Sequence, residues 1–317
     1  MKRVFICIII LLLAAVPVDG FTVELTLHPA KAPEPAQKYQ LLPKADEQSD
    51  VDAAPLYEKA VQLLPEDFQT DQISQWLKTP PAKLPRQQVQ STLQQFKPIL
   101  QFLEQAAKCK QCDLPYMDDD DTISQNLRKY RRLVFFLALQ MRFQITQGQF
   151  DKAIGTAQTG FAMAKHIGEG PTLIHGMIGV GMGSIICRQL EQFVQGPNAP
   201  NLYRALRGLP RPFIDLTERS EFEDRDIRES THLLMNRLDR HVAALQCVEA
   251  LRLYAAVHDG KFPKELSIIT EVPVPSDPVM QKPFVYRCTG SDAVLEAPAP
   301  EGATERDAMR YELNLKE

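Results

Sequence analysis

The sequence has little of what most directly indicates a function. Its 317 residues include one tryptophan, six histidines and six cysteines, and the formal net charge is only −4. A general nucleic-acid-binding protein needs a basic face, so the mild acidity argues against that class. Hydrophobic residues make up 44% of the chain and charged residues 24%. These average values exclude a mostly disordered chain, a collagen-like repeat and a disulfide-rich miniprotein, and the length is enough for about two domains or one extended helical array.

Motifs for catalysis, metals and nucleotides are also missing. The glycine-rich segment 170–187 lacks a following Lys-Ser/Thr pair and any strand–helix–strand context, so it matches neither nucleotide-binding fingerprint. We interpret it as a closely packed helix whose glycines face a neighbouring helix. His166 and His175, on either side of the turn at 168–171, are interpreted as structural residues. The sequence therefore gives no catalytic, cofactor-binding or metal-binding residue, and we expect no cofactor.

The N-terminus has the pattern of a secretory signal peptide. A basic start, Lys2 and Arg3, precedes an apolar run of about 13 residues, which is too short to span a bilayer of ~30 Å hydrocarbon. Val18 and Gly20 supply the small residues needed at positions −3 and −1 of a cleavage site. We predict that residues 1–20 are removed by cleavage after Gly20, with retention as an anchor as the alternative. The protein is then exported, to the periplasm or the extracellular space.

Export would place the cysteines in an oxidising compartment, where disulfides can form. Five cysteines remain after cleavage, so at least one has no partner within the chain. Cys109 and Cys112 form the only closely spaced pair, and we predict a local disulfide between them. A thiol–disulfide catalytic site is the alternative, but the pair follows a predicted helix, whose C-terminus disfavours a thiolate. A zinc site would need a second Cys or His pair at ligand spacing, and none is present. The pairing of the other three cysteines stays open: Cys187, Cys247 and Cys288.

Apolar periodicity predicts a mainly helical protein after a flexible leader at 21–50, which is rich in Pro, Ala, Lys and Gln. A helical body is expected over 51–216, a long connecting helix over 217–260, and a small strand module over 261–317. Within the body, Pro98 should kink or split the helix predicted over 89–107. The strands of the module are predicted by alternation at 284–288, 293–296 and 309–315.

The segment 147–154 resembles the turn between the two helices of a tetratricopeptide repeat. Gly148 stands where the first helix ends, Phe150 where the second begins, and the small Ala153 follows three residues later. The segment 56–65 looks like the end of another such second helix. The resemblance implies an array of degenerate helical hairpins, whose concave surface usually binds peptide or protein.

A second resemblance covers about 65 residues at the C-terminus. Tyr254, Gly260, Phe262 and Pro263, followed by Asp277-Pro278 and the run 282–286, are similar to the junction between helix and globular head in type II secretion major pseudopilins. The resemblance implies a head-like module of short antiparallel strands. Pilus assembly is not implied, because the apolar helix that polymerises pilins is absent next to this head.

Most of residues 51–315 also resemble a family of exported bacterial helical proteins. The segments that carry this likeness are Cys112-Asp113 and the ranges 147–175, 200–206, 210–216 and 271–278. The likeness implies a helical body with a small tail module and brings no activity with it.

From these observations we expect a non-enzymatic protein-binding or scaffolding component of the cell envelope. Its partner is expected to be a protein or peptide, without nucleic acid and without a stable membrane span after signal cleavage. The alternative is an envelope enzyme, either a hydrolase whose acids the sequence does not identify or a thiol–disulfide oxidoreductase that uses Cys109 and Cys112.

Overall fold

The computed structural model describes residues 21–65, 70–114, 120–215, 225–301 and 303–316. The predicted fold class, mainly α with a small module of short antiparallel strands at the C-terminal end, is confirmed. The helices are α2 (Ala54–Gln62), α3 (Asp71–Lys78), α4 (Arg86–Gln95), α5 (Lys97–Ala106), α6 (Asp120–Thr146), α7 (Phe150–Gly168), α8 (Leu173–Phe193), α9 (Tyr203–Arg207) and α10 (Arg225–Val257). The strands are β1 (Phe21–Leu27), β2 (Ser49–Asp52), β3 (Cys109–Gln111), β4 (Val285–Thr289), β5 (Asp292–Ala297) and β6 (Met309–Leu315). The predicted signal peptide and the cleavage after Gly20 lie outside the described residues.

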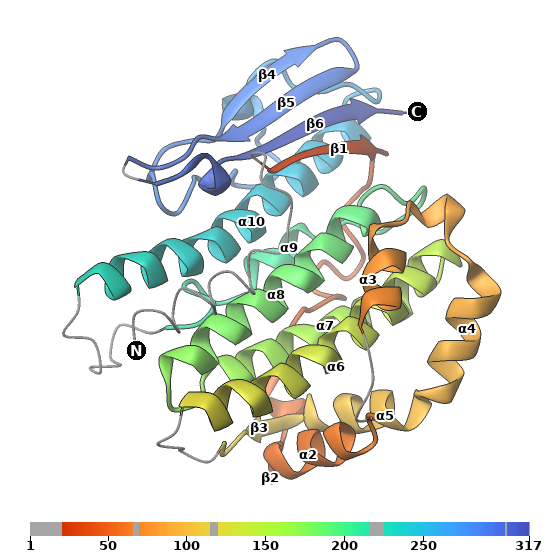
Figure 1. Ribbon diagram of the computed structural model, residues 1–317. Coiled ribbons are helices and arrows are strands. Elements are labelled where there is room, and N and C mark those ends of the chain that lie inside the picture. Colours follow the sequence, from red (N-terminus) through yellow and green to blue (C-terminus); the bar gives the residue numbers. More distant parts are fainter. Residues whose placement is uncertain (1–20, 66–69, 115–119, 216–224, 302, 317) are drawn as a thin grey trace.

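The elements are stacked in layers, as Figure 1 shows. The sheet lies on α10, which packs on α8, and the hairpins formed by α6, α7 and α8 continue the stack. The short helices α2 to α5 pack along the side of α6, and α5 also contacts α7. One continuous set of buried apolar side chains runs from the sheet through these layers, so the described parts share a core.

Two predicted helix breaks lie where the sequence places them. Pro98 stands in the first turn of α5, and the predicted helix 89–107 is split into α4 and α5 at Phe96. Gly148 has φ +67°, a left-handed conformation that glycine adopts without a steric penalty, and α7 begins at Phe150. The ring of Phe150 packs edge-on against Phe193 of α8, with 5.2 Å between ring centroids. The aromatic residue after the turn therefore ties the α6–α7 hairpin to the next helix.

The glycines of α8 allow the closest helix contact in the body. A Cβ added at Gly179 would lie 2.5 Å from the Cα of Gly168 and 2.5 Å from the carbonyl oxygen of Ala164, both in α7. The prediction of a closely packed glycine-rich helix is confirmed. Of the described helices, α8 is also the one long and apolar enough to cross a membrane, but 72% of its apolar window is buried inside the fold. Its apolar composition is accounted for by this buried position.

The prediction of a flexible leader at 21–50 is wrong at its start. Residues 21–27 form β1, which pairs in parallel with β6 at one edge of a sheet of order β1-β6-β5-β4 (Figure 1). The segment alternates apolar and polar residues, so Leu25 and Leu27 enter the core while Glu24 faces outward. The module predicted at 261–317 therefore contains a strand from the opposite end of the sequence.

The chain after β1 is fastened to α10 by a buried arginine. Arg252 is fully buried and paired with Glu249 at 2.9 Å. Its Nε donates to the carbonyl oxygen of His28 and its Nη2 to that of Ala199. The backbone N–H of Ala30 in turn donates to the carbonyl of Arg252. One side chain thus holds the N-terminal segment, the α8–α9 connection and α10 together.

Candidate binding cleft

The predicted disulfide between Cys109 and Cys112 is not formed, and both residues are free thiols. Cys109 begins β3, which pairs with β2, so the backbone from this residue towards Cys112 is extended. Cα atoms three residues apart in a strand are about 10 Å apart. A disulfide needs Cα atoms within about 7 Å. The prediction of a local disulfide is therefore wrong because β3 pairs with β2 in a small parallel ladder. Nothing in the sequence predicted this ladder.

The environment of this pair also differs from that of a catalytic thiol. Burial raises the pKa of both thiols, and the neighbouring Asp52 carboxylate raises that of Cys112 further. Reactive cysteines have a lowered pKa because nearby positive groups stabilise the thiolate. Cys187 and Cys247 are fully buried and their pKa values are raised by burial as well.

His166 and His175 are separate structural residues. Nε2 of His166 lies 3.1 Å from the carbonyl oxygen of Cys109, so it carries the proton, and Nδ1 accepts from the Tyr57 hydroxyl at 2.9 Å. This neutral imidazole links α7, β3 and α2, and burial lowers its pKa. His175 accepts from the backbone N–H of Thr172 and caps the start of α8. The described residues contain no group of three or more His, Cys, Asp or Glu side chains that could hold a metal ion.

A cleft of about 360 Å³ opens between α9, the loop after it, α10 and the segment 273–275. Its polar lining is Tyr203, Arg207, Arg211 and Gln246; Leu209, Pro273, Val274 and Pro275 line the rest. Sites for small ligands and peptide side chains commonly have this size and this mixture of apolar surface with a few polar groups. The cleft is therefore the candidate functional site.

Buried hydrogen bonds fix the helical side of the cleft. Asn201, which is 2% exposed, accepts from the backbone N–H of Tyr203 at the start of α9 and donates to the carbonyl of Glu249 in α10 at 2.8 Å. The guanidinium of Arg211 donates to Oε1 of the buried Gln246. Burial raises the pKa of Tyr203, and a hydrogen bond from Gln246 opposes that shift. Arg211 is thus held in place by α10, whereas Arg207 extends from α9 into solvent.

The opposite wall is a proline-rich segment whose carbonyl groups point to the helices. The Tyr203 hydroxyl donates to the carbonyl of Pro273, and the Cys247 thiol lies 3.5 Å from that of Pro275. Proline has no backbone N–H, so this wall offers ring and side-chain carbon to the cleft instead of donors.

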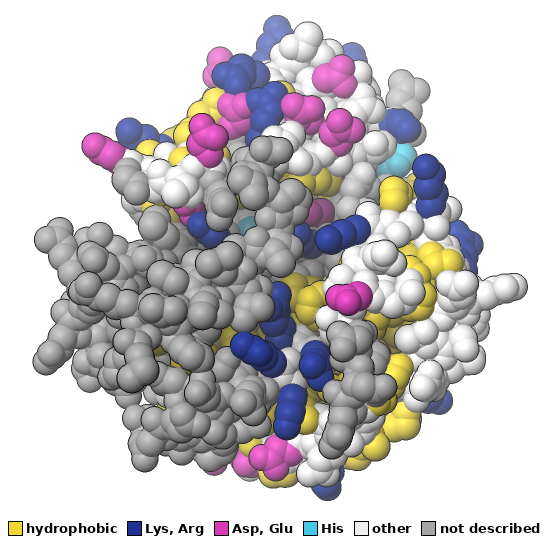
Figure 2. All heavy atoms as spheres, viewed as in Figure 1, with side chains coloured by type: hydrophobic (Ala, Val, Ile, Leu, Met, Phe, Trp, Pro, Cys, Tyr) yellow, Lys and Arg dark blue, Asp and Glu magenta, His cyan; other side chains and the backbone are white. Residues whose placement is uncertain are grey.

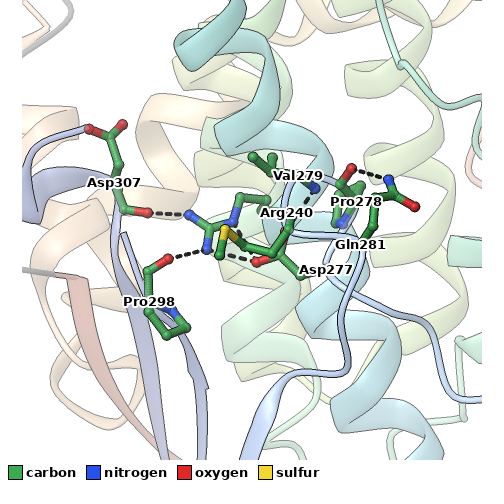
Figure 3. Close-up of polar contacts among 8 residues, drawn as sticks. Arg240, Asp277, Pro278, Val279, Gln281, Pro298 and Asp307 are labelled. Atoms are coloured by element: carbon green, nitrogen blue, oxygen red, sulfur yellow. Dashed lines mark hydrogen bonds and ion pairs between the residues drawn. The ribbon is translucent and has the colours of Figure 1, made fainter. Parts of the chain in front are cut away.

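Beyond this wall, Asp277 and Arg240 lock the segment to α10 (Figure 3). Oδ2 of Asp277 accepts from Nε of Arg240 at 3.0 Å and from Nη2 at 2.8 Å, while Oδ1 caps the backbone N–H of Val279. The same guanidinium reaches the carbonyl groups of Pro298 and Asp307. Asp277, the first residue of the Asp-Pro step, therefore forms a buried clamp between the module and α10.

The charge of the cleft is positive, and the buried Asp239 carboxylate interacts electrostatically with Arg211. Within the part of the chain that the structure describes, Arg204, Arg207 and Arg211 form no ion pair. The acids that flank the cleft in sequence have partners: Glu271 binds His258 at 2.7 Å, and Asp277 and Glu249 bind the arginines named above. Over the sheet, by contrast, Arg287, Glu296, Arg310 and Glu312 form a paired row, and Figure 2 shows charges of both signs mixed at that end of the molecule.

No local pattern in the sequence indicates this cleft. Arg207 and Arg211 lie four residues apart, and Gly208-Leu209-Pro210 between them indicates only a loop. The wall that faces the two arginines, 273–275, follows some 60 residues later in the sequence. Three of the ranges on which the predicted family likeness rests contain cleft residues: Tyr203 in 200–206, Arg211 in 210–216 and residues 273–275 in 271–278. No spacing rule joins these ranges. Their cleft residues meet only because the three segments dock on α10.

Comparison with protein-family models, with curated proteins and with solved structures gives no match for this chain.

Proposed function

We propose that the chain is an exported, non-enzymatic protein-binding component of the cell envelope, and that it binds a polypeptide segment in the α9 cleft. The observation that carries the proposal is an open cleft whose two arginines form no ion pair within the described residues. Export is supported by the basic start, the short apolar run and the small residues before position 21.

The enzymatic alternatives have less support. Burial raises the pKa of the thiols of Cys109 and Cys112, which disfavours the thiolate that an oxidoreductase needs. A hydrolase would need acids available in the cleft. Glu249 and Asp277 are ion-paired with Arg252 and Arg240, Glu271 is hydrogen-bonded to His258, and the buried Asp239 accepts from the backbone N–H of Phe213. Fixed walls and a local positive charge suit recognition better than proton transfer.

A photo-reactive residue in the cleft wall tests the proposal. Val274, half-buried in the wall, is replaced by a photo-reactive phenylalanine analogue in the full chain, and the matched control carries it at the exposed Val285 of β4. Irradiation in an envelope extract of the producing organism should give a discrete cross-linked protein from position 274 alone. The product should be lost when Arg207 and Arg211 are also changed to Ala. No product, or the same products from both positions, contradicts the proposal.

A further inference from the structure

The surroundings of the arginines restrict what can occupy the cleft. Arg204 and Arg207 are three residues apart on α9, so they share a face of that helix, and both are exposed. Arg211 follows after the loop and is oriented by Gln246. Guanidinium groups form their strongest hydrogen bonds with planar anions such as carboxylates. The occupant must therefore bring negative charge to at least two separated points.

The volume and lining favour a peptide over a small anion. A cleft of about 360 Å³ is larger than one phosphate or sulphate needs, and half of its lining residues are apolar or proline: Leu209, Pro273, Val274 and Pro275. Such surface suits the aliphatic side chains and backbone of an extended segment. The carbonyl groups of Pro273 and Pro275 are already engaged, so these two residues contribute mainly shape.

Nucleic acid fits the same surface less well. Binding of single strands relies on aromatic rings on which bases stack. The one aromatic residue of the lining, Tyr203, is 3% exposed and its hydroxyl is bound to Pro273.

We infer that the cleft selects an acidic segment of a partner polypeptide, whose carboxylates bind Arg207 and Arg211 while its apolar side chains lie against 273–275. This inference rests on the proposed binding function and adds the chemistry of the partner. Charge complementarity between a local positive site and a partner segment speeds association and excludes basic competitors.

A display experiment tests the charge requirement without assuming a sequence. Random twelve-residue peptides on phage are selected on the immobilised full-length protein, on the Arg207→Glu/Arg211→Glu variant, and on a control with the same charge change, Lys59→Glu/Lys97→Glu. Both lysines are exposed on α2 and α5, far from α9 in Figure 1. Peptides enriched on the wild type and on the control should be rich in Asp and Glu. Each selected peptide should bind the arginine variant about tenfold more weakly, or worse, and bind more weakly in higher salt.

Two further measurements distinguish failure of the acidic preference from failure of the proposed binding function. Val274→Trp fills the cleft without changing charge, and circular dichroism confirms that each variant is folded. If the selected peptides are neutral or basic and Val274→Trp blocks their binding, the proposed binding function is supported but the acidic preference is overturned. If the selected peptides bind Arg207→Glu/Arg211→Glu and Val274→Trp as tightly as the wild type, both the proposed binding function and the acidic preference are overturned. A labelled single-stranded DNA decamer that binds through Arg207 and Arg211, where acidic peptides do not, would also overturn the inference.

Discussion

At the scale of single residues, two ion-paired arginines illustrate how burial sets the value of an ion pair. Arg240 of α10 and Asp277 have side chains 3% exposed, whereas the side chain of Arg287 in β4, paired with Glu296, is 64% exposed, and Glu296 is also paired with Arg310. Removing one partner of a buried pair leaves the other charged group without compensation, whereas an exposed pair contributes little.

The substitution Arg240→Met should therefore lower the free energy of unfolding by about 3–5 kcal/mol. The matched variant Arg287→Met should cost about 1 kcal/mol or less, because Arg287 is exposed and Glu296 keeps its pair with Arg310. Urea unfolding followed by circular dichroism measures both values. Equal effects of the two substitutions would show that Arg240 does not clamp the module to α10.

His166 gives a second prediction at this scale. Burial lowers its pKa, so between that value and the ordinary value near 6.5 the unfolded chain binds a proton that the folded chain does not. This contribution to stability is complete above about pH 6.5 and is lost as the pH falls. His166→Gln removes the titration, so the variant should lose less stability than the wild type between pH 7.5 and 5.0. The difference should be about 1.4 kcal/mol per unit of pKa lowering. Parallel pH profiles of the two proteins in urea unfolding would contradict this assignment.

At the scale of elements, the closeness of two packed helices depends on whether a glycine of one lies against the backbone of the other. Gly179 of α8 faces backbone atoms of Ala164 and Gly168, whereas Gly155 of α7 is exposed, with nothing within 4 Å of an added Cβ. Alanine has the higher helix propensity, by up to about 1 kcal/mol, so any loss at Gly179 must come from the clash.

Gly179→Ala should destabilise the protein by about 1–3 kcal/mol, because rigid backbone cannot move away from the new methyl group. Gly155→Ala should be neutral or stabilise by up to about 1 kcal/mol. Thermal unfolding of the two variants side by side measures the difference. A stabilising Gly179→Ala would mean that α7 and α8 are less closely packed than described.

Elements with strong local signals could be predicted from the sequence. The break at Pro98, the turn at Gly148 and the three C-terminal strands follow from residues next to one another in the chain. The strand β1 was missed although 21–27 alternates, because its partner β6 lies almost 290 residues away and the segment follows an apolar signal-like run. The ladder of β2 with β3 was missed for the same reason, and with it the extended backbone at Cys109.

At the scale of the whole molecule, the sheet joins the two ends of the described chain. If β1 is a structural strand, Leu25→Ala should cost about 2–5 kcal/mol, because Leu25 is 1% exposed in the core. Val51→Ala, at a side chain 58% exposed, is the control and should change stability by less than about 0.5 kcal/mol. A Leu25→Ala variant as stable as the wild type would restore the interpretation of 21–50 as a leader.

The cleft is the feature of the whole molecule that local sequence could least predict. Its residues come from three segments of the chain, and no recognisable motif surrounds any of them in the sequence: Arg207, Arg211, Gln246 and Val274. Their convergence depends on three anchors that only the tertiary structure reveals: Asn201 on α10, Tyr203 on Pro273, and Arg240 on Asp277.

Competition at the cleft tests the central claim most directly. The partner cross-linked from position 274 is captured again on the immobilised wild-type protein, without irradiation. The column is then washed with a selected acidic peptide or with its analogue in which every Asp and Glu is Asn or Gln. Recognition of carboxylates by Arg207 and Arg211 predicts release by the acidic peptide alone. A partner that stays bound to the column, or that both peptides release equally, would contradict the claim.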